Sequence, residues 1–261
     1  MSNYTPLKLY FDTELARMLA LKIRDTGAHF PVENYVREVA SRVGDLELKQ
    51  RIEVLADGLY CNLSGDYPEK IRVLTAILGP ENPNETGMFT EGYWLMPVAF
   101  VAEKYGIDHF RVSTSFIGQV TRRNTGEYAI RPYIEKYPEQ TLRLMNRWSK
   151  SRNFHLRRLA SEGLRPRLPW ARKLDCFIDS PNEVFAILEN LKSDDSRFVQ
   201  KSVANHLKDM LRENYPATIR IVERWSNSSW EQTQWIVRHA IKNEIKVQNP
   251  EVLSILDRVA P

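Results

Sequence analysis

The stretch Phe154-His-Leu-Arg-Arg-Leu-Ala160 returns twice, as Phe198-Val-Gln-Lys-Ser-Val-Ala204 and Gln234-Trp-Ile-Val-Arg-His-Ala240. Each copy has a bulky residue near its start, a basic residue in its middle and an alanine at its end. From alanine to alanine the copies lie 44 and 36 residues apart, a period typical of stacked helix pairs. This period predicts HEAT-like packing, in which each pair buries its apolar face against its neighbours. An irregular helical bundle is the alternative.

Around these copies, apolar residues recur every three or four positions, which is the period of a helix, and no long stretch alternates like a strand. In one predicted helix, Val199, Val203, Leu207 and Leu211 form the buried stripe. The expected helices cover 13–26, 33–43, 46–62, 67–79, 92–105, 110–122, 126–136, 138–149, 153–163, 181–192, 195–213, 216–225, 229–246 and 249–258.

These patterns predict an all-α protein, an α-solenoid of HEAT-like helical repeats with a concave basic groove. We expect a single all-helical domain over 1–261. Its N-terminal helical half is 1–110, and 111–261 holds the repeats that line the groove. A loop at 79–88 and a short basic connector at 163–170, rich in Gly, Pro and Asn, interrupt the helices.

Positive charge is concentrated in one window of the chain. Residues 141–173 hold ten Lys or Arg and one acid, Glu162, a net of +9. The remaining residues hold 27 basic and 32 acidic side chains, a net of −5. A basic stretch without interleaved acids favours a polyanionic partner such as duplex DNA, held through its phosphates. A solvated helical face is the alternative.

Composition and spacing exclude several classes. A chain of 261 residues, 43% of them hydrophobic, is neither disordered nor collagen-like. No apolar run approaches the ~20 residues of a membrane span, and no secretion signal opens the sequence. The two cysteines and five histidines have no metal-ligand spacing, and no P-loop, GxGxxG or GxSxG occurs. We expect a cytoplasmic monomer with no metal and no cofactor.

Several longer segments of the sequence resemble segments that are typical of a known protein family. Asn153-Phe-His-Leu-Arg-Arg-Leu-Ala-Ser-Glu-Gly-Leu-Arg-Pro-Arg-Leu-Pro-Trp170 resembles the signature of the AlkC family of bacterial DNA alkylation-repair glycosylases. Three other segments resemble the repeats of this family: Ser202-Val-Ala-Asn205 with Asp209, Trp235-Ile-Val-Arg-His-Ala240 and Glu127-Tyr-Ala-Ile-Arg-Pro132. Leu46-Glu-Leu-Lys-Gln-Arg51 and Phe30-Pro-Val-Glu33 resemble its N-terminal half. The resemblance runs nearly end to end, and it favours the shorter branch without a C-terminal immunoglobulin-like domain.

The resemblance implies a monofunctional DNA glycosylase that excises cationic N-alkylated bases, 3-methyladenine foremost, from double-stranded DNA. It also implies that the damaged base is not flipped into a pocket, unlike in most glycosylases. The chemistry is consistent with this, because a base methylated at a ring nitrogen is already a good leaving group. Its departure leaves positive charge on the deoxyribose, which fixed carboxylates stabilise. A carboxylate can also orient or deprotonate the attacking water.

Matching the motifs assigns the candidate site residues. The resemblance places Glu127, Glu162, Asp209 and Trp170 at the catalytic site, with the Trp170 ring facing the cationic nucleotide. It assigns to the DNA backbone Arg158, Arg165, Arg167, Lys201, Asn205 and Arg238.

Each assignment has a structural alternative. Glu162 pairs with Arg158 one turn away, and Glu127 closes a helix N-terminus. Asp209 is a surface partner of Lys208 or Arg212. In the same alternative, Trp170 plugs a gap between repeats, and Arg165 and Arg167 cap helix ends.

Two other functions remain open at this point. One is a non-catalytic HEAT-like binder of branched or damaged DNA, against which the retained acid Glu162 argues. The other is a protein-binding scaffold, against which the basic window argues. No lysine stands out as a Schiff-base nucleophile, so we expect no strand-cleaving lyase step.

Overall fold

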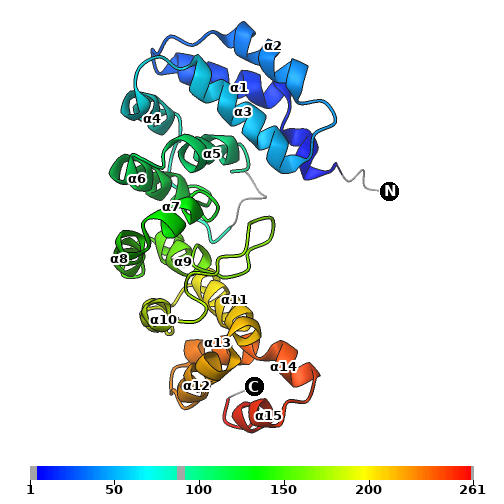
Figure 1. Ribbon diagram of the computed structural model, residues 1–261, viewed down its shortest axis with the longest axis vertical. Helices are drawn as coiled ribbons and strands as arrows, with labels where there is room; N and C mark the ends of the chain where they lie inside the picture. The colour runs from blue at the N-terminus through cyan, green and yellow to red at the C-terminus, as the bar shows by residue number, and fades with distance from the viewer. Residues whose placement is uncertain (1–4, 87–91, 260–261) are drawn as a thin grey trace. The chain divides into compact units, whose positions relative to one another are not determined.

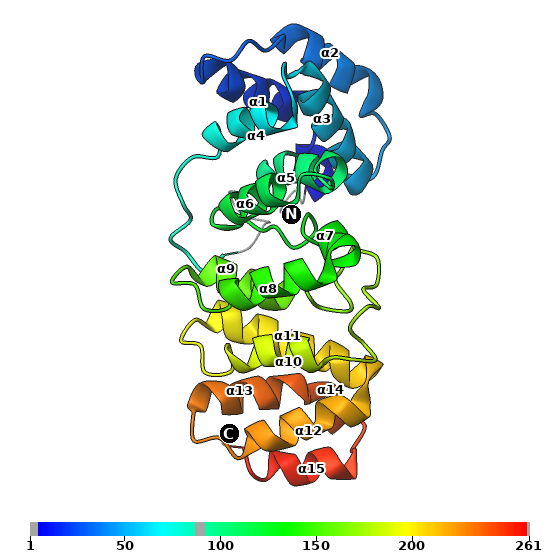
Figure 2. The ribbon, with the colours of Figure 1, turned by 60° about the vertical axis from the view of Figure 1, so that its left-hand side comes forward.

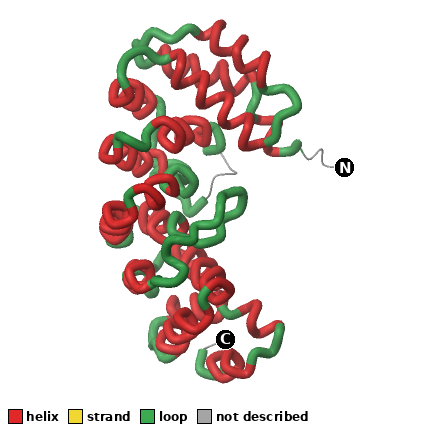
Figure 3. The backbone as a smooth tube through the Cα atoms, in the orientation of Figure 1, coloured by secondary structure: helices red, strands yellow, loops and turns green. Residues whose placement is uncertain are grey.

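A computed structural model describes residues 5–86 and 92–259. In these two ranges every regular element is a helix and no strand occurs (Figure 1, Figure 3). The expected all-α class is therefore confirmed. The chain divides into two compact units, Met1–Pro132 and Tyr133–Pro261, and their action as a single domain stays a prediction. In the described part, no helix is both long and apolar enough to cross a membrane.

Before α7, the described residues of the first unit form a 3-10 helix and six α-helices. They are η1 (Leu7–Tyr10), α1 (Thr13–Asp25), α2 (Val32–Arg42), α3 (Leu48–Asn62), α4 (Tyr67–Ala76), α5 (Leu95–Tyr105) and α6 (Phe110–Thr121). Helix α2 packs between α1 and α3, α3 also packs on α5, and α6 packs on α4 and α5. A Cβ at Gly58 of α3 would overlap the ring of Tyr35 on α2, so glycine permits this close approach.

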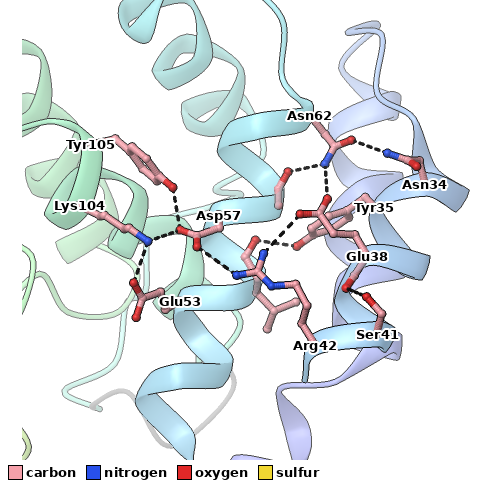
Figure 4. Close-up of polar contacts among 12 residues, drawn as sticks. Asn34, Tyr35, Glu38, Ser41, Arg42, Glu53, Asp57, Asn62, Lys104 and Tyr105 are labelled. Carbon is pink, nitrogen blue, oxygen red and sulfur yellow. Dashed lines mark hydrogen bonds and ion pairs between the residues drawn. The ribbon is translucent and has the colours of Figure 1, made fainter. Parts of the chain in front are cut away.

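A network of charged side chains joins three of these helices (Figure 4). Asp57 of α3 accepts hydrogen bonds from Lys104 Nζ and from Tyr105 Oη of α5, each at 2.7 Å. Its other carboxylate oxygen lies 3.5 Å from Arg42 Nη2 of α2. Lys104 also donates to Glu53 Oε1 at 2.7 Å. The network therefore ties α2 and α5 to α3 through one half-buried carboxylate.

Helix α7 (Arg131–Lys136) crosses the boundary between the units, and the second unit contains the remaining helices. They are α8 (Pro138–Trp148), α9 (Phe154–Glu162), α10 (Asn182–Glu189), α11 (Arg197–Glu213), α12 (Tyr215–Ser226), α13 (Glu231–Ala240), α14 (Lys242–Lys246) and α15 (Pro250–Leu256). In this unit α9, α11 and α13 form one layer and α8, α10 and α12 the other (Figure 1, Figure 2).

Helix α11 is the centre of the second unit. It packs against α9 on one side, against α13 on the other, and against α12. The predicted stripe of Val199, Val203, Leu207 and Leu211 is buried, which confirms it. Burying each such side chain contributes about 1.5–3 kcal/mol. Because α11 is covered on two sides, polar residues outside the stripe are buried as well. The candidate active site is built partly from these buried polar residues.

Most predicted helices agree with the structure to within three residues at each end, but two differ in where they start or in their continuity. The helix expected over 126–136 begins only at Arg131, after turns at 127–130. Pro132 is the reason, because a proline fits the first helical turn but lacks the N–H that a helix interior needs. The helix expected over 229–246 is two helices, since α13 ends at Ala240 and α14 begins at Lys242.

Candidate active site

The centre of the site is an acid pair held by one arginine. Glu162 is the last residue of α9, and Asp209 lies on α11. Arg165, in the loop after α9, donates from Nη1 to Glu162 Oε1 at 2.6 Å and from Nε to Asp209 Oδ2 at 2.8 Å. One guanidinium thus bridges two carboxylates that are 47 positions apart in sequence, 162 and 209. Sequence reasoning assigned these residues separately and missed the bridge.

Glu162 has further partners on both of its oxygens. Ser202 of α11 donates its hydroxyl to Oε2 at 2.6 Å, and Nη2 of Arg158 lies 3.5 Å from Oε1. Glu162 is 5% exposed, and Ser202 is buried too. The ion pair with Arg158 that served as the structural alternative is present, but it is one of three polar contacts. Glu162 therefore has a fixed rotamer and a fixed negative charge.

The pKa values of the two acids move in opposite directions. Burial raises the pKa of Glu162, but the charges of Arg158 and Arg165 and the bonds from Ser202 and Arg165 outweigh it and hold the pKa below its ordinary value. Burial raises the pKa of Asp209 above its ordinary value, and the opposing effect of Arg165 is smaller. Two carboxylates whose environments separate their pKa values are suited to different roles.

Asp209 keeps one oxygen open. Its side chain is 13% exposed, and among the described residues no donor reaches Oδ1. The hydrogen bond of Asp209 goes to Arg165 and not to Lys208 or Arg212, its partners in the structural alternative, although the charge of Lys208 also favours the ionised form of Asp209. Asp209 therefore offers an unoccupied carboxylate oxygen beside a carboxylate that is fully engaged.

Glu127 lies in the first unit, in the turn before α7. It is buried, and its Oε2 accepts a hydrogen bond from Thr125 Oγ1 at 2.8 Å. It does not lie at the N-terminus of a helix that begins at 126, as its alternative required, since no helix begins there. Its convergence with Glu162 and Asp209 stays a prediction.

Trp170 and Arg167 lie in the loop between α9 and α10. Trp170 is 58% exposed, and its φ of 64° places a bulky residue in the left-handed region, where such residues are uncommon. An exposed ring held in a strained backbone conformation is a feature of functional sites. Because most of its ring is exposed, Trp170 does not plug a gap between repeats, as its structural alternative required. Arg167 forms an ion pair with Glu213, which Lys173 also contacts at 2.9 Å.

The remaining predicted DNA contacts lie on three helices. Arg158 of α9 places its guanidinium 4.6 Å from the ring centroid of Phe198. Lys201 of α11 is exposed, and Asn205 accepts a hydrogen bond from Lys208 at 3.1 Å. Arg238 of α13 is half-buried and donates to the carbonyl of Val259 at 3.2 Å. Contact of any of these side chains with DNA stays a prediction.

One residue of this hydrogen-bonded cluster, Ser202, was missed. It lies within a word that resembles the family, but only its neighbours Asn205 and Asp209 were assigned roles. The available signal was its place three positions after Val199, on the side of α11 that faces α9. A hydroxyl at such a position needs a buried partner. Among the described residues, no group of three or more His, Cys, Asp or Glu side chains is arranged to hold a metal ion.

Known proteins share this arrangement of helices. Residues 124–243, which hold the helical repeats of the second unit, match the family described as DNA alkylation repair enzyme. The structure of the Pseudomonas fluorescens alkylpurine DNA glycosylase AlkC, bound to DNA containing an abasic-site analogue, matches with a TM-score of 0.88. It is 30% identical, and the match covers 97% of this chain and 68% of that one. The chain belongs to the AlkC family of DNA alkylation repair enzymes.

Two further proteins are similar to this chain. The uncharacterized protein YhaZ of Bacillus subtilis (strain 168) is 30% identical over 252 residues, which are 95% of this chain and 67% of YhaZ. The structure of AlkD2 from Streptococcus mutans is 21% identical, has a TM-score of 0.57 and covers 80% of this chain and 97% of that one. AlkD2 shows similarity of fold alone. Together with AlkC, it confirms the expected HEAT-like helical-repeat fold.

Proposed function

We propose that the chain is a monofunctional DNA glycosylase that hydrolyses the N-glycosidic bond of cationic N-alkylated bases, 3-methyladenine foremost, in double-stranded DNA. The observation that carries this proposal is the acid pair Glu162 and Asp209, gathered from two helices by Arg165. Membership of the AlkC family supports the reaction class. A non-catalytic binder has no use for a buried carboxylate within a strongly basic window.

The two acids have different tasks in this proposal. Glu162 stays ionised and immobile, so its charge stabilises the positive deoxyribose as the base leaves. Asp209, with Oδ1 open and a raised pKa, orients the attacking water and accepts its proton. The departing base is already cationic, so no general acid is needed on the leaving group.

The other assigned residues complete the proposal. Glu127 adds a third carboxylate, and the exposed ring of Trp170 attracts the cationic nucleotide by about 0.5–2 kcal/mol. Arg165 orients the two acids in addition to its expected contact with the DNA backbone. The other backbone contacts are Arg158, Arg167, Lys201, Asn205 and Arg238.

The test is release of 3-methyladenine from methylated duplex DNA by the purified full chain. We expect Glu162→Gln, which keeps the size of the side chain, to slow release by about 100-fold or more while DNA affinity changes little. The matched control is Glu139→Gln, at an exposed carboxylate of α8. No release by the wild-type chain, or equal release by the wild type and Glu162→Gln, overturns the proposal. A preference for branched DNA without release indicates the non-catalytic binder.

A further inference from the structure

The loop that joins α9 to α10 contains the exposed ring of Trp170 (Figure 1). Within it the backbone N–H of Leu174 donates to the carbonyl of Pro166 at 2.9 Å, which closes a smaller loop. We call residues 166–174 the Trp170 loop. Leu168 and Leu174 are buried on its two arms, so this loop has an anchored base and an exposed tip.

The tip of the Trp170 loop is a tight turn in which a tryptophan occupies a position that suits glycine. The backbone N–H of Ala171 donates to the carbonyl of Leu168 at 3.1 Å, Pro169 follows Leu168, and Trp170 has a φ of 64°. Proline at the second place of a turn and a positive φ at the third are features of a type II turn, whose third place favours Gly or Asn. A bulky side chain costs free energy there, so the turn needs support from its surroundings.

Glu213, the last residue of α11, contacts both arms of the Trp170 loop. Its Oε1 forms an ion pair with Nε of Arg167, and its Oε2 lies 2.9 Å from Nζ of Lys173. Arg167 lies three positions before Trp170, and Lys173 lies three positions after it. One carboxylate therefore fastens the loop on each side of the tryptophan, at the same separation along the chain.

The helix that ends at Glu213 also carries one member of the acid pair. Asp209 and Glu213 are one turn apart on α11, and they contact Arg165 and Arg167, which are two positions apart in the loop. Two consecutive turns of α11 thus hold two alternate residues of the loop. This arrangement fixes the base of the Trp170 loop relative to Asp209.

Glu213 carries a negative charge in a surface that we expect to face phosphates. The hydrogen bond from Lys173, and after it that from Arg167, outweigh the effect of burial and hold the pKa of Glu213 below its ordinary value. In a chain with the function proposed above, this charge opposes DNA binding, because it repels phosphates and occupies Arg167. A carboxylate that opposes binding needs another task.

We propose that Glu213 is a positioning residue, which holds both arms of the Trp170 loop and so keeps the ring of Trp170 fixed relative to Asp209. This inference rests on the function proposed above, in which Trp170 attracts the cationic nucleotide and Asp209 orients the water. Glu213 acts through the loop and contacts neither the nucleotide nor the water. Its contribution to excision therefore does not exceed that of Trp170 itself.

The first test is a double-mutant cycle on single-turnover release of 3-methyladenine from methylated duplex DNA by the full chain. We expect Trp170→Ala to slow release by about 2- to 30-fold, the value of one cation–π contact, and Glu213→Gln to slow it by the same factor or less. Adding Glu213→Gln to Trp170→Ala has no further effect, because the ring that Glu213 positions is gone. The matched control is Asp175→Asn, which removes an exposed carboxylate 2.8 Å from Lys173 and leaves both contacts of Glu213 in place.

Three results of the cycle overturn the proposal. The first is wild-type release by Glu213→Gln. The second is equal slowing by Glu213→Gln in the presence and absence of the Trp170 ring, which a merely structural role would give. The third is wild-type release by Trp170→Ala, because the ring then has no contribution for Glu213 to support. Circular dichroism of each variant confirms that it is folded.

The second test needs neither DNA nor excision. The chain has six tryptophans, and in fluorine NMR of the chain labelled with 5-fluorotryptophan the signal of Trp170 is the one that Trp170→Phe removes. We expect Glu213→Gln to shift or narrow this signal alone, and Asp175→Asn to leave all the signals in place. An unchanged Trp170 signal, or equal changes in all the signals, overturns the proposal even if the chain releases 3-methyladenine. A changed Trp170 signal in a chain that releases no base supports the hold of Glu213 on the loop and refutes the glycosylase instead.

Discussion

The hydroxyl of Ser202 on α11 donates a 2.6 Å hydrogen bond to Oε2 of Glu162 at the end of α9, between two buried side chains. Hydrogen bonds to a charged group contribute about 1.5–3 kcal/mol. Because this bond forms between the two packed helices, it connects the packing of the unit directly to the orientation of the proposed catalytic carboxylate. In the proposed mechanism Ser202 acts through Glu162 and is thus a positioning residue.

Ser202→Ala is expected to lower single-turnover excision by about 10-fold or more, because Glu162 loses one of its constraints. Loss of a bond to the ionised form also raises the pKa of Glu162, so the loss of excision caused by protonation of Glu162 begins at a higher pH than in the wild type and adds to the acidic limb set by Asp209. The matched control is Ser161→Ala, since the Ser161 hydroxyl is buried but has no hydrogen-bond partner among the described residues. Equal pH profiles for the two variants would contradict the positioning role.

Arg165→Met is expected to destabilise the second unit by about 3–5 kcal/mol, because it leaves Glu162 and Asp209 facing each other in a buried site without their shared cation. Urea unfolding followed by circular dichroism measures this. Arg167→Met is the control: Arg167 is exposed and paired with Glu213, so its removal costs about 0–1 kcal/mol. If Arg165→Met costs no more than Arg167→Met, the arginine does not hold the acids together.

Asp209→Asn is expected to lower excision by about 100- to 10,000-fold, the usual contribution of a general base. In the wild type, the raised pKa of Asp209 places the acidic limb of the rate profile above the ordinary pKa of an aspartate, about 3.9. The rate rises with pH through this limb because the base acts in its ionised form. Single-turnover rates from acidic to neutral pH measure it. If the acidic limb of the pH–rate profile is the same in Asp209→Asn as in the wild type, Asp209 is not the general base.

Asp57→Asn is expected to destabilise the first unit by about 1.5–3 kcal/mol at neutral pH, since the carboxylate accepts bonds from Lys104 and Tyr105. Burial raises the pKa of Asp57, but its bonds from Lys104 and Tyr105 and the charge of Lys104 hold it below the ordinary value. Its stabilisation is therefore present above the unfolded-state pKa of about 3.9 and is lost as pH falls through the lower folded-state pKa.

Urea unfolding at neutral pH and near pH 3 tests the Asp57 prediction. Asp57→Asn is expected to lose less stability on acidification than the wild type does. The comparison variant is Glu53→Gln, which removes only the exposed partner of Lys104 and costs about 0–1 kcal/mol. Identical acid dependence in the wild type and Asp57→Asn would show that this carboxylate does not carry the effect.

Much of the local structure was predictable from the sequence. Helix α11 follows from its apolar period, and α9 begins after Asn153, whose side chain accepts from the backbone N–H groups of His155 and Leu156. Apolar periods and helix caps are predictable because the residues that form them lie within a few positions of each other in the sequence. The break between α13 and α14 was missed because the apolar period continues through Ile241. The late start of α7 was missed because Pro132 was read as part of a helix interior rather than of a first turn.

The candidate acids were also proposed from the sequence, all three by the family resemblance, with Glu162 drawing attention first as the single acid of the basic window. Their partners were not. Arg165 is three positions from Glu162, yet its second carboxylate is 44 positions away, and Ser202 is 40 positions from Glu162. Periodicity assigns a residue to a face of its own helix, whereas these bonds depend on how α9 lies against α11. That packing arises from burial of apolar surface along both helices, and only the folded chain shows which polar atoms it brings within hydrogen-bonding distance.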